Sequence, residues 1–193
     1  TTGYGIYVSN TTFTGGIDNS GTILADDYYG IYISNTTFEG GLDNSGLISA
    51  DSYGIYLSTT NWTGGVNNSG VIQSADSTGA YLSVTNWTGG FTNDGTILGG
   101  TDPAGSGYGV YGSVTTFSGD FVNNGLIAGG VNGYTGVYLT GSLFDGDVTN
   151  TGTIIGTGTY DGLSLNHTLY TGDVTNSGKI TGGGTGIYVN GGT

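Results

Sequence analysis

The amino-acid sequence predicts an all-β protein of the parallel β-helix type, a β-solenoid of about seven coils with about 25 residues each. Three observations lead to this prediction. Glycine accounts for 43 of the 193 residues, whereas charged residues make up only 8% and strong helix formers are scarce. The apolar residues recur in short alternating runs broken by Gly and Asn, which favours strands and leaves no window for a helix. Finally, two short motifs return along the whole chain at regular spacing.

The first repeated motif is apolar–x–Asn–x–Gly–x–Ile, which occurs first at Ile17–Ile23 and last at Val174–Ile180. We expect its Asn to point inward and to hydrogen-bond with the Asn above and below it, forming a ladder. We expect the following Gly to adopt a positive φ at a corner of the coil. The equivalent asparagines are Asn19, Asn44, Asn68, Asn93, Asn123, Asn150 and Asn176.

The second motif is Gly–apolar–Tyr–apolar, which lies about twelve residues upstream of the first. Strand alternation predicts that Ile6 and Val8 point into the core and that Tyr7 points outward. The resulting tyrosine stripe is either a surface for carbohydrate, protein or a sister filament, or aromatic stacking that stiffens the sheet, which we favour. The stripe contains Tyr7, Tyr32, Tyr56, Tyr81, Tyr111, Tyr138 and Tyr188. The repeats start near residues 5, 30, 54, 79, 109, 136, 162 and 186.

The residues between the two motifs complete the predicted core. Phe13, Ile17, Asn19 and Ile23 share one parity, so like residues should stack on each other in successive coils. Successive coils would lie about 4.8 Å apart through parallel strand pairing. The insertion at Thr101–Gly107 lengthens one repeat without changing its motifs.

The boundaries of the chain lie inside the repeat pattern. The first residues already belong to a repeat, and the last residues break off after a new repeat begins. We therefore interpret residues 1–193 as one β-solenoid segment of a longer repetitive protein. The segment has no Cys and no apolar run of the ~20 residues that would cross a bilayer.

The net charge of −13 disfavours two classes of partner. Nucleic acids bind proteins largely through Lys and Arg, of which this chain has one in total. Anionic lipid surfaces repel such a chain for the same reason. We expect neither nucleic-acid binding nor direct membrane insertion of this segment.

Acidic residues recur in two columns that are candidates for weak Ca²⁺ binding, because this ion prefers several oxygen ligands. The competing interpretation, which we favour, is a solvated outward ladder of carboxylates. No other cofactor is expected. The candidate residues are Asp120, Asp147 and Asp173 in one column and Asp26, Asp51 and Asp76 in the other.

The sequence contains no arrangement of residues that is typical of catalysis, so we predict no catalytic residue. There is no Arg, Lys179 is the only Lys, and His167 has no Ser and Asp partners at a matching spacing. The Asp columns form a series, whereas an active site is usually one irregular place. Paired threonines change position from repeat to repeat, which disfavours an ice-binding array.

The apolar–x–Asn–x–Gly–x–Ile motif, in a chain that is Cys-free, acidic and rich in Gly, Thr and Asn, resembles the passenger domains of autotransporters and related adhesins. This resemblance implies a right-handed β-helix that is displayed on a bacterial cell surface or released outside the cell. It also implies a non-enzymatic, rigid rod for adhesion or for cell–cell and biofilm contact, with surface glycans or proteins as partners. The alternative is a subunit of an extracellular filament that pairs with its own copies through strand edges. A polysaccharide-active enzyme is the least favoured interpretation.

Overall fold

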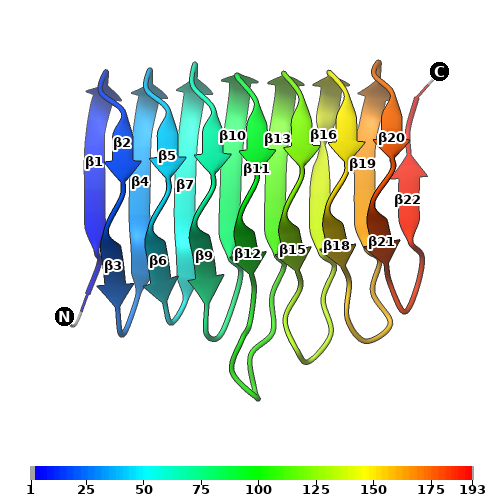
Figure 1. Cartoon of the computed structure of the whole chain (residues 1–193). Coiled ribbons are helices and arrows are strands. Elements are labelled where there is room, and N and C mark those ends of the chain that lie inside the picture. Colours follow the sequence, from blue (N-terminus) through cyan, green and yellow to red (C-terminus); the bar gives the residue numbers. More distant parts are fainter. Residues whose placement is uncertain (1–2, 193) are drawn as a thin grey trace.

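The computed structural model describes residues 3–192 and confirms the predicted β-solenoid. Thr1, Thr2 and Thr193, which belong to the predicted segment, lie outside the described residues. Among residues 3–192 every regular element is a strand, and the strands form three parallel sheets that run along the stack (Figure 1). Each coil contributes one long strand and two short strands, so the cross-section has three sides.

The long strands form an eight-stranded sheet, which we call the long sheet. These strands begin at the Gly–apolar–Tyr motif and end near the aromatic residue that follows it. In sheet order they are β1 (Ile6–Phe13), β4 (Tyr29–Phe38), β7 (Tyr53–Trp62), β10 (Ala80–Thr88), β13 (Val110–Ser118), β16 (Val137–Asp145), β19 (Leu163–Tyr170) and β22 (Ile187–Asn190).

The short strands come from the apolar–x–Asn–x–Gly–x–Ile motif and form two seven-stranded sheets. The first short sheet ends each of its strands at the Asn of the motif, as β2 (Ile17–Asn19), β5 (Leu42–Asn44), β8 (Val66–Asn68), β11 (Phe91–Asn93), β14 (Phe121–Asn123), β17 (Val148–Asn150) and β20 (Val174–Asn176). The second short sheet starts after the Gly, as β3 (Thr22–Ala25), β6 (Leu47–Ala50), β9 (Val71–Ser74), β12 (Thr96–Leu98), β15 (Leu126–Ala128), β18 (Thr153–Ile155) and β21 (Lys179–Thr181).

The register of the sheets places equivalent residues directly on each other. In the long sheet Ile6 pairs with Ile31 and Tyr7 with Tyr32, and in the first short sheet Ile17 pairs with Leu42. The insertion at Thr101–Gly107 does not disturb this register, because it leaves as a loop between β12 and β13 that projects beyond its neighbours (Figure 1). The periodic motifs therefore define straight columns of side chains along the stack.

The inward columns are apolar and closely packed, as strand alternation predicted. Ile48, Leu57 and Trp62 are completely buried in the interior coils. One column consists of aromatic rings whose centroids lie 4.5–5.6 Å apart from coil to coil. Such contacts stabilise aromatic pairs by about 0.5–1.5 kcal/mol each beyond the area that they bury. The column contains Phe13, Phe38, Trp62, Trp87, Phe117, Phe144 and Tyr170.

The seven asparagines of the first motif form a second inward column. The side-chain Nδ2 of Asn44 donates to Oδ1 of Asn68 at 2.7 Å, and Nδ2 of Asn68 donates to Oδ1 of Asn93 at 2.8 Å. Nδ2 of Asn44 also donates to the backbone carbonyls of Gly46 and Val71, both at 3.2 Å. The same pattern recurs from Asn19 to Asn176, always with the donor pointing toward the next coil. These hydrogen bonds satisfy amides that would otherwise be costly to bury.

The glycine of the same motif does not have the positive φ that we expected at this corner, so that expectation is wrong. The reason for glycine is instead the close approach of successive coils. A Cβ on Gly46 would lie 2.0 Å from the carbonyl oxygen of Gly21, and one on Gly95 would lie 2.1 Å from that of Gly70. Both distances are far below van der Waals contact, so a side chain would push the coils apart. None of the seven motif glycines, Gly21, Gly46, Gly70, Gly95, Gly125, Gly152 and Gly178, has a positive φ. The close approach applies to all of them except Gly21 in the first coil, where a Cβ would meet nothing within 4 Å.

Candidate functional site

The outer face of the long sheet carries a column of tyrosines, which we call the strand tyrosine column. Consecutive rings from Tyr7 to Tyr138 stack nearly in parallel, with centroids 4.9–5.7 Å apart and interplanar angles of 1–13°. Ser164 interrupts the column in β19, and Tyr188 resumes it in β22. Stacking leaves the interior rings half-buried, whereas Tyr7 in the first coil is 57% exposed. The column consists of Tyr7, Tyr32, Tyr56, Tyr81, Tyr111 and Tyr138.

A second set of tyrosines, which sequence reasoning missed, lies beside the first, just before or at the start of the long strands. We call it the flanking tyrosine column, and it consists of Tyr4, Tyr29, Tyr53, Tyr108, Tyr134 and Tyr160. Tyr29 contacts Tyr53 with ring centroids 5.1 Å apart, and Tyr134 stacks on Tyr160 at 5.2 Å. Tyr29 also stacks on Tyr32 and Tyr56 of the strand column. The two columns therefore form one continuous aromatic surface, the tyrosine face.

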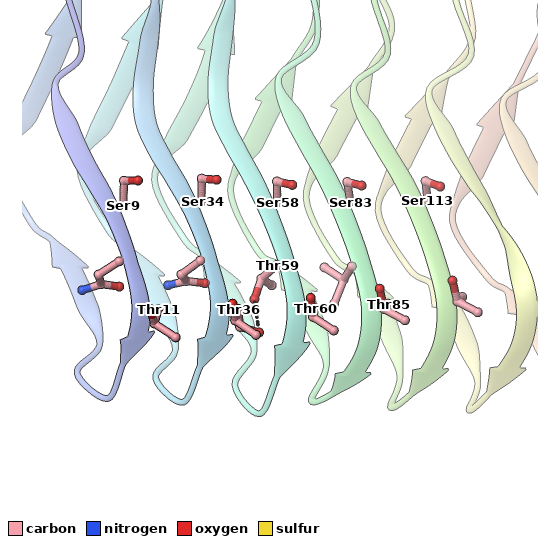
Figure 2. A pocket seen from close by; sticks show the side chains of 14 residues that line it. Ser9, Thr11, Ser34, Thr36, Ser58, Thr59, Thr60, Ser83, Thr85 and Ser113 are labelled. Carbon is pink, nitrogen blue, oxygen red and sulfur yellow. Dashed lines mark hydrogen bonds between the residues drawn. The ribbon is translucent and has the colours of Figure 1, made fainter.

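A groove lined by hydroxyl groups runs beside the strand tyrosine column on the same face of the long sheet. In β1, β4, β7, β10 and β13 the outward residue after the Tyr is a Ser, and the next is a Thr, as in Tyr56, Ser58 and Thr60. Figure 2 shows the serines and threonines in two rows that cross the strands from coil to coil. The groove has a volume of about 630 Å³. Its rows contain Ser9, Ser34, Ser58, Ser83 and Ser113, and Thr11, Thr36, Thr60, Thr85 and Thr115.

The regular Thr row differs from what the sequence indicated. The paired threonines change position in the sequence because the residue that precedes each outward Thr differs between coils. The register pairs Asn35 with Thr59 and Thr59 with Val84, so the residues that follow them align as one outward column. The irregular residues therefore lie in an inward column, whereas the outward Thr column on the surface is regular.

The tyrosine face is electrically neutral at ordinary pH. Burial raises the pKa of Tyr56 and of Tyr81, and neighbouring tyrosines raise it further, because two phenolates in contact would repel each other. The pKa of Tyr108 is raised for the same two reasons. The phenol groups of Tyr56, Tyr81 and Tyr108 therefore remain protonated, and the groove beside them has no charged side chain in its lining. The surface offers aromatic rings and neutral hydroxyl groups.

The first predicted Asp column lies on the surface and bonds to the backbone. Oδ1 of Asp120 accepts a hydrogen bond from the backbone N–H of Asp147 at 2.9 Å, and Oδ1 of Asp147 accepts one from that of Asp173 at 2.9 Å. All three residues are exposed. These contacts give the carboxylates a structural role in joining consecutive coils.

The second predicted Asp column gathers negative charge at the turns that follow the second short sheet. Burial raises the pKa of Asp51, and the charges of Asp76 and Asp26 raise it further. Within residues 3–192, however, no three carboxylate or imidazole side chains come together in an arrangement that could hold a metal ion. The hypothesis of weak Ca²⁺ binding stays a prediction, and an unchanged melting temperature with Ca²⁺ or with chelator would exclude it.

Within the described range no helix is long and apolar enough to cross a membrane. Searches of family models, curated proteins and solved structures found no match to this chain, so what it does must be inferred from its own residues.

Proposed function

We propose that this chain is the non-enzymatic, rigid shaft of an extracellular adhesive protein, and that its tyrosine face and groove bind neutral polysaccharide. The observation that carries the proposal is the alignment of aromatic and hydroxyl columns over successive coils of one sheet. The finer assignment to autotransporter-type passenger domains, and the location at a bacterial cell surface, rest on the resemblance of the repeat motif. The β-solenoid fold is compatible with this assignment.

The chemistry of the surface favours a neutral sugar polymer as the ligand. Sugar rings have C–H faces that pack on aromatic rings, and hydroxyl edges that exchange hydrogen bonds with Ser and Thr. A protein with a net charge of −13 repels acidic polymers, whereas a neutral polymer carries no such penalty. The groove follows the axis of the stack, so a polymer can repeat its contacts from coil to coil.

The same surface offers little for catalysis. The groove is lined by Ser, Thr, Asn and Val, without the pair of carboxylates that glycoside hydrolysis commonly uses. The side chain of His167 lies in the core, 3% exposed, where its ring packs edge-on against Phe144 at 5.4 Å. Burial lowers its pKa to about 4, so the imidazole is neutral and turned away from the groove face. These observations favour binding over hydrolysis.

Native gel electrophoresis in gels that contain hydroxyethyl cellulose tests the proposal. We expect the neutral polymer to retard the protein, and polygalacturonate, an acidic polymer, to leave its mobility unchanged. The double variant Tyr32→Ser/Tyr56→Ser should lose the retardation, because it removes two adjacent rings of the strand tyrosine column. Asn67→Ser is the matched control, since Asn67 is an exposed residue of the first short sheet.

Three results would contradict the proposal. The first is equal mobility of the wild-type protein with and without neutral polymers, and the second is equal retardation of the double variant. The third is the release of new reducing ends from the polymer, which would favour the enzyme interpretation. Electron microscopy of the same sample separates the remaining alternative, because long uniform fibres would favour a filament subunit over dispersed rods.

A further inference from the structure

The flanking tyrosine column has a gap at the start of the fourth coil. The residue before the Gly of the long-strand motif is Tyr53 in the third coil and Tyr108 in the fifth, but Thr78 in the fourth. The flanking column therefore has no ring between Tyr53 and Tyr108, and the space between these two residues is a pocket of about 230 Å³. Its floor is formed by Tyr81 and Tyr111 of the strand column, whose rings stack at 4.9 Å.

The position of the gap coincides with the one long insertion in the repeat pattern. Ser106 and Gly107, at the end of the insertion Thr101–Gly107, form part of the pocket wall. The insertion is held in place by backbone hydrogen bonds from Thr101 N–H to the Ser74 carbonyl at 3.0 Å and from Ser106 N–H to the Asp76 carbonyl at 2.9 Å. Two irregularities of the repeat, the Thr in place of a Tyr and the inserted loop, therefore lie side by side at this pocket.

The residues around the gap are packed and ordered by their own contacts. Thr78 is only 3% exposed, and its Oγ1 accepts a hydrogen bond from the backbone N–H of Tyr108 at 3.2 Å. Tyr53 contacts Tyr81 edge-on at 5.5 Å, and Tyr108 contacts Tyr111 at 5.1 Å. The walls therefore keep their positions without a ring between them.

We propose that this pocket, which we call the Thr78 notch, binds one pyranose ring of a neutral β-linked glucan between Tyr53 and Tyr108. This inference rests on the proposed function and assigns the place where binding is strongest. Tyr53 and Tyr108 belong to coils two steps apart, so roughly 9.6 Å separates their backbones. A ring placed midway lies about 4.8 Å from each wall, which is within the range of aromatic contacts. The rings of Tyr53 and Tyr108 are inclined by 67° and 49° to the strand tyrosines Tyr81 and Tyr111, so they contact such a ring edge-on or at a tilt.

The two-sided geometry selects the configuration of the sugar. In β-glucose all ring substituents are equatorial, so both faces of the ring present only C–H groups to the tyrosines. A sugar with an axial hydroxyl, such as mannose, presents a polar group to one wall and leaves it without a partner there. The pocket lining consists of Tyr, Ser, Thr and Gly, which have no formal charge to attract an acidic sugar. We therefore expect the notch to prefer cellohexaose over mannohexaose.

The inference is tested by filling the notch with tyrosine, the residue that other coils have at this position. Thr78→Tyr places a tyrosine where the second, third and fifth coils already have one, so the variant should fold normally. Isothermal titration should show cellohexaose binding weakened by about tenfold or more, since two ring contacts are lost. The matched control is Asn67→Tyr, which places the same side chain at an exposed position of the first short sheet, outside the tyrosine face, and should leave the affinity unchanged.

A second variant keeps the inference testable if Thr78→Tyr does not fold. Tyr53→Ser removes one wall of the notch and should also weaken cellohexaose binding. The inference is overturned if Thr78→Tyr binds cellohexaose like the wild type, or if mannohexaose binds equally well. It is also overturned if the wild type is retarded by hydroxyethyl cellulose but does not bind cellohexaose, a result that leaves the proposed function standing. Loss of both kinds of binding in the wild type would overturn the proposed function itself.

Discussion

Replacing one asparagine in the middle of the ladder should destabilise the whole fold far more than the same replacement at its end. Asn93 is completely buried, and its side chain makes hydrogen bonds to both neighbouring coils. Its Oδ1 accepts from Asn68 at 2.8 Å, and its Nδ2 donates to Asn123 at 2.8 Å and to the carbonyl of Leu126 at 3.2 Å. The variant Asn93→Leu keeps the branched shape of the side chain and replaces the amide oxygen and nitrogen with methyl groups, so it leaves no space for water to replace these bonds.

The size of the effect follows from the groups that the substitution leaves behind. The two bonds between side-chain amides contribute about 1 kcal/mol each. Oδ1 of Asn123, whose donor is Nδ2 of Asn93, remains buried without a donor, which costs about 1–3 kcal/mol more. Nδ2 of Asn68 keeps its bonds to backbone carbonyls and adds little. We therefore expect Asn93→Leu to lower the free energy of unfolding by about 3–5 kcal/mol.

The control is Asn176→Leu at the last step of the ladder. Asn176 is exposed, and its Oδ1 accepts one hydrogen bond, from Asn150 at 2.7 Å. Because water can reach the groups left behind, this variant should lose about 1 kcal/mol or less. Both variants have the same chemistry, so the difference between them measures burial within the ladder.

Urea unfolding measures both variants, with fluorescence of Trp62 and Trp87 as the signal. Both indoles are buried in the core, and Trp87 lies in the same coil as Asn93. The midpoint should shift strongly for Asn93→Leu and little for Asn176→Leu, with similar slopes if unfolding remains cooperative. Equal shifts for the two variants, or a loss below about 1 kcal/mol for Asn93→Leu, would refute the argument that the buried ladder stabilises the stack.

Three further predictions concern single side chains. Burial lowers the pKa of His167 to about 4, so the folded chain binds fewer protons than the unfolded chain between pH 4 and 6.5. Thermal stability should therefore fall as the pH drops from 6.5 to 4, and His167→Leu should remove this part of the loss. Burial raises the pKa of Tyr170 to about 12, so the melting temperature should fall as the pH rises from 10 toward 12. The fall should be smaller in Tyr170→Phe, and identical pH profiles of the variant and the wild type would contradict this prediction. Gly95→Ala should lower the melting temperature strongly, because its Cβ would lie 2.1 Å from the carbonyl oxygen of Gly70, whereas Gly21→Ala, with nothing within 4 Å, should have little effect.

The fold could be predicted from the sequence because a solenoid is nearly one-dimensional. Each coil contacts mainly the coils beside it, so the spacing of two motifs fixes which residues stack. Strand parity then separates inward residues such as Ile33 and Asn44 from outward residues such as Tyr32. The aromatic core column and the inward Asn column both follow from these two properties.

Other features could not be predicted because they depend on the distance between coils and on the turns. The spacing of Gly46 in its motif indicated a corner but not that the preceding coil approaches too closely for a Cβ. The outward Thr column was hidden, because the inward residue beside it changes from Asn35 to Thr59 to Val84. The flanking tyrosines precede the repeated motif, and their only signal was the Tyr–Gly dipeptide that begins several repeats.

Repetition and its interruption have different consequences for binding. A polymer that contacts the Tyr, Ser and Thr of one coil can make the same contacts in the next, so individually weak contacts add up along the chain. Identical coils cannot, however, fix where the polymer sits, because a shift by one coil restores all the contacts. The Thr78 notch breaks this equivalence, since it offers one ring a place between Tyr53 and Tyr108 that no shifted position reproduces. The regular columns therefore provide the extent of the binding surface, and the irregular fourth coil provides its register.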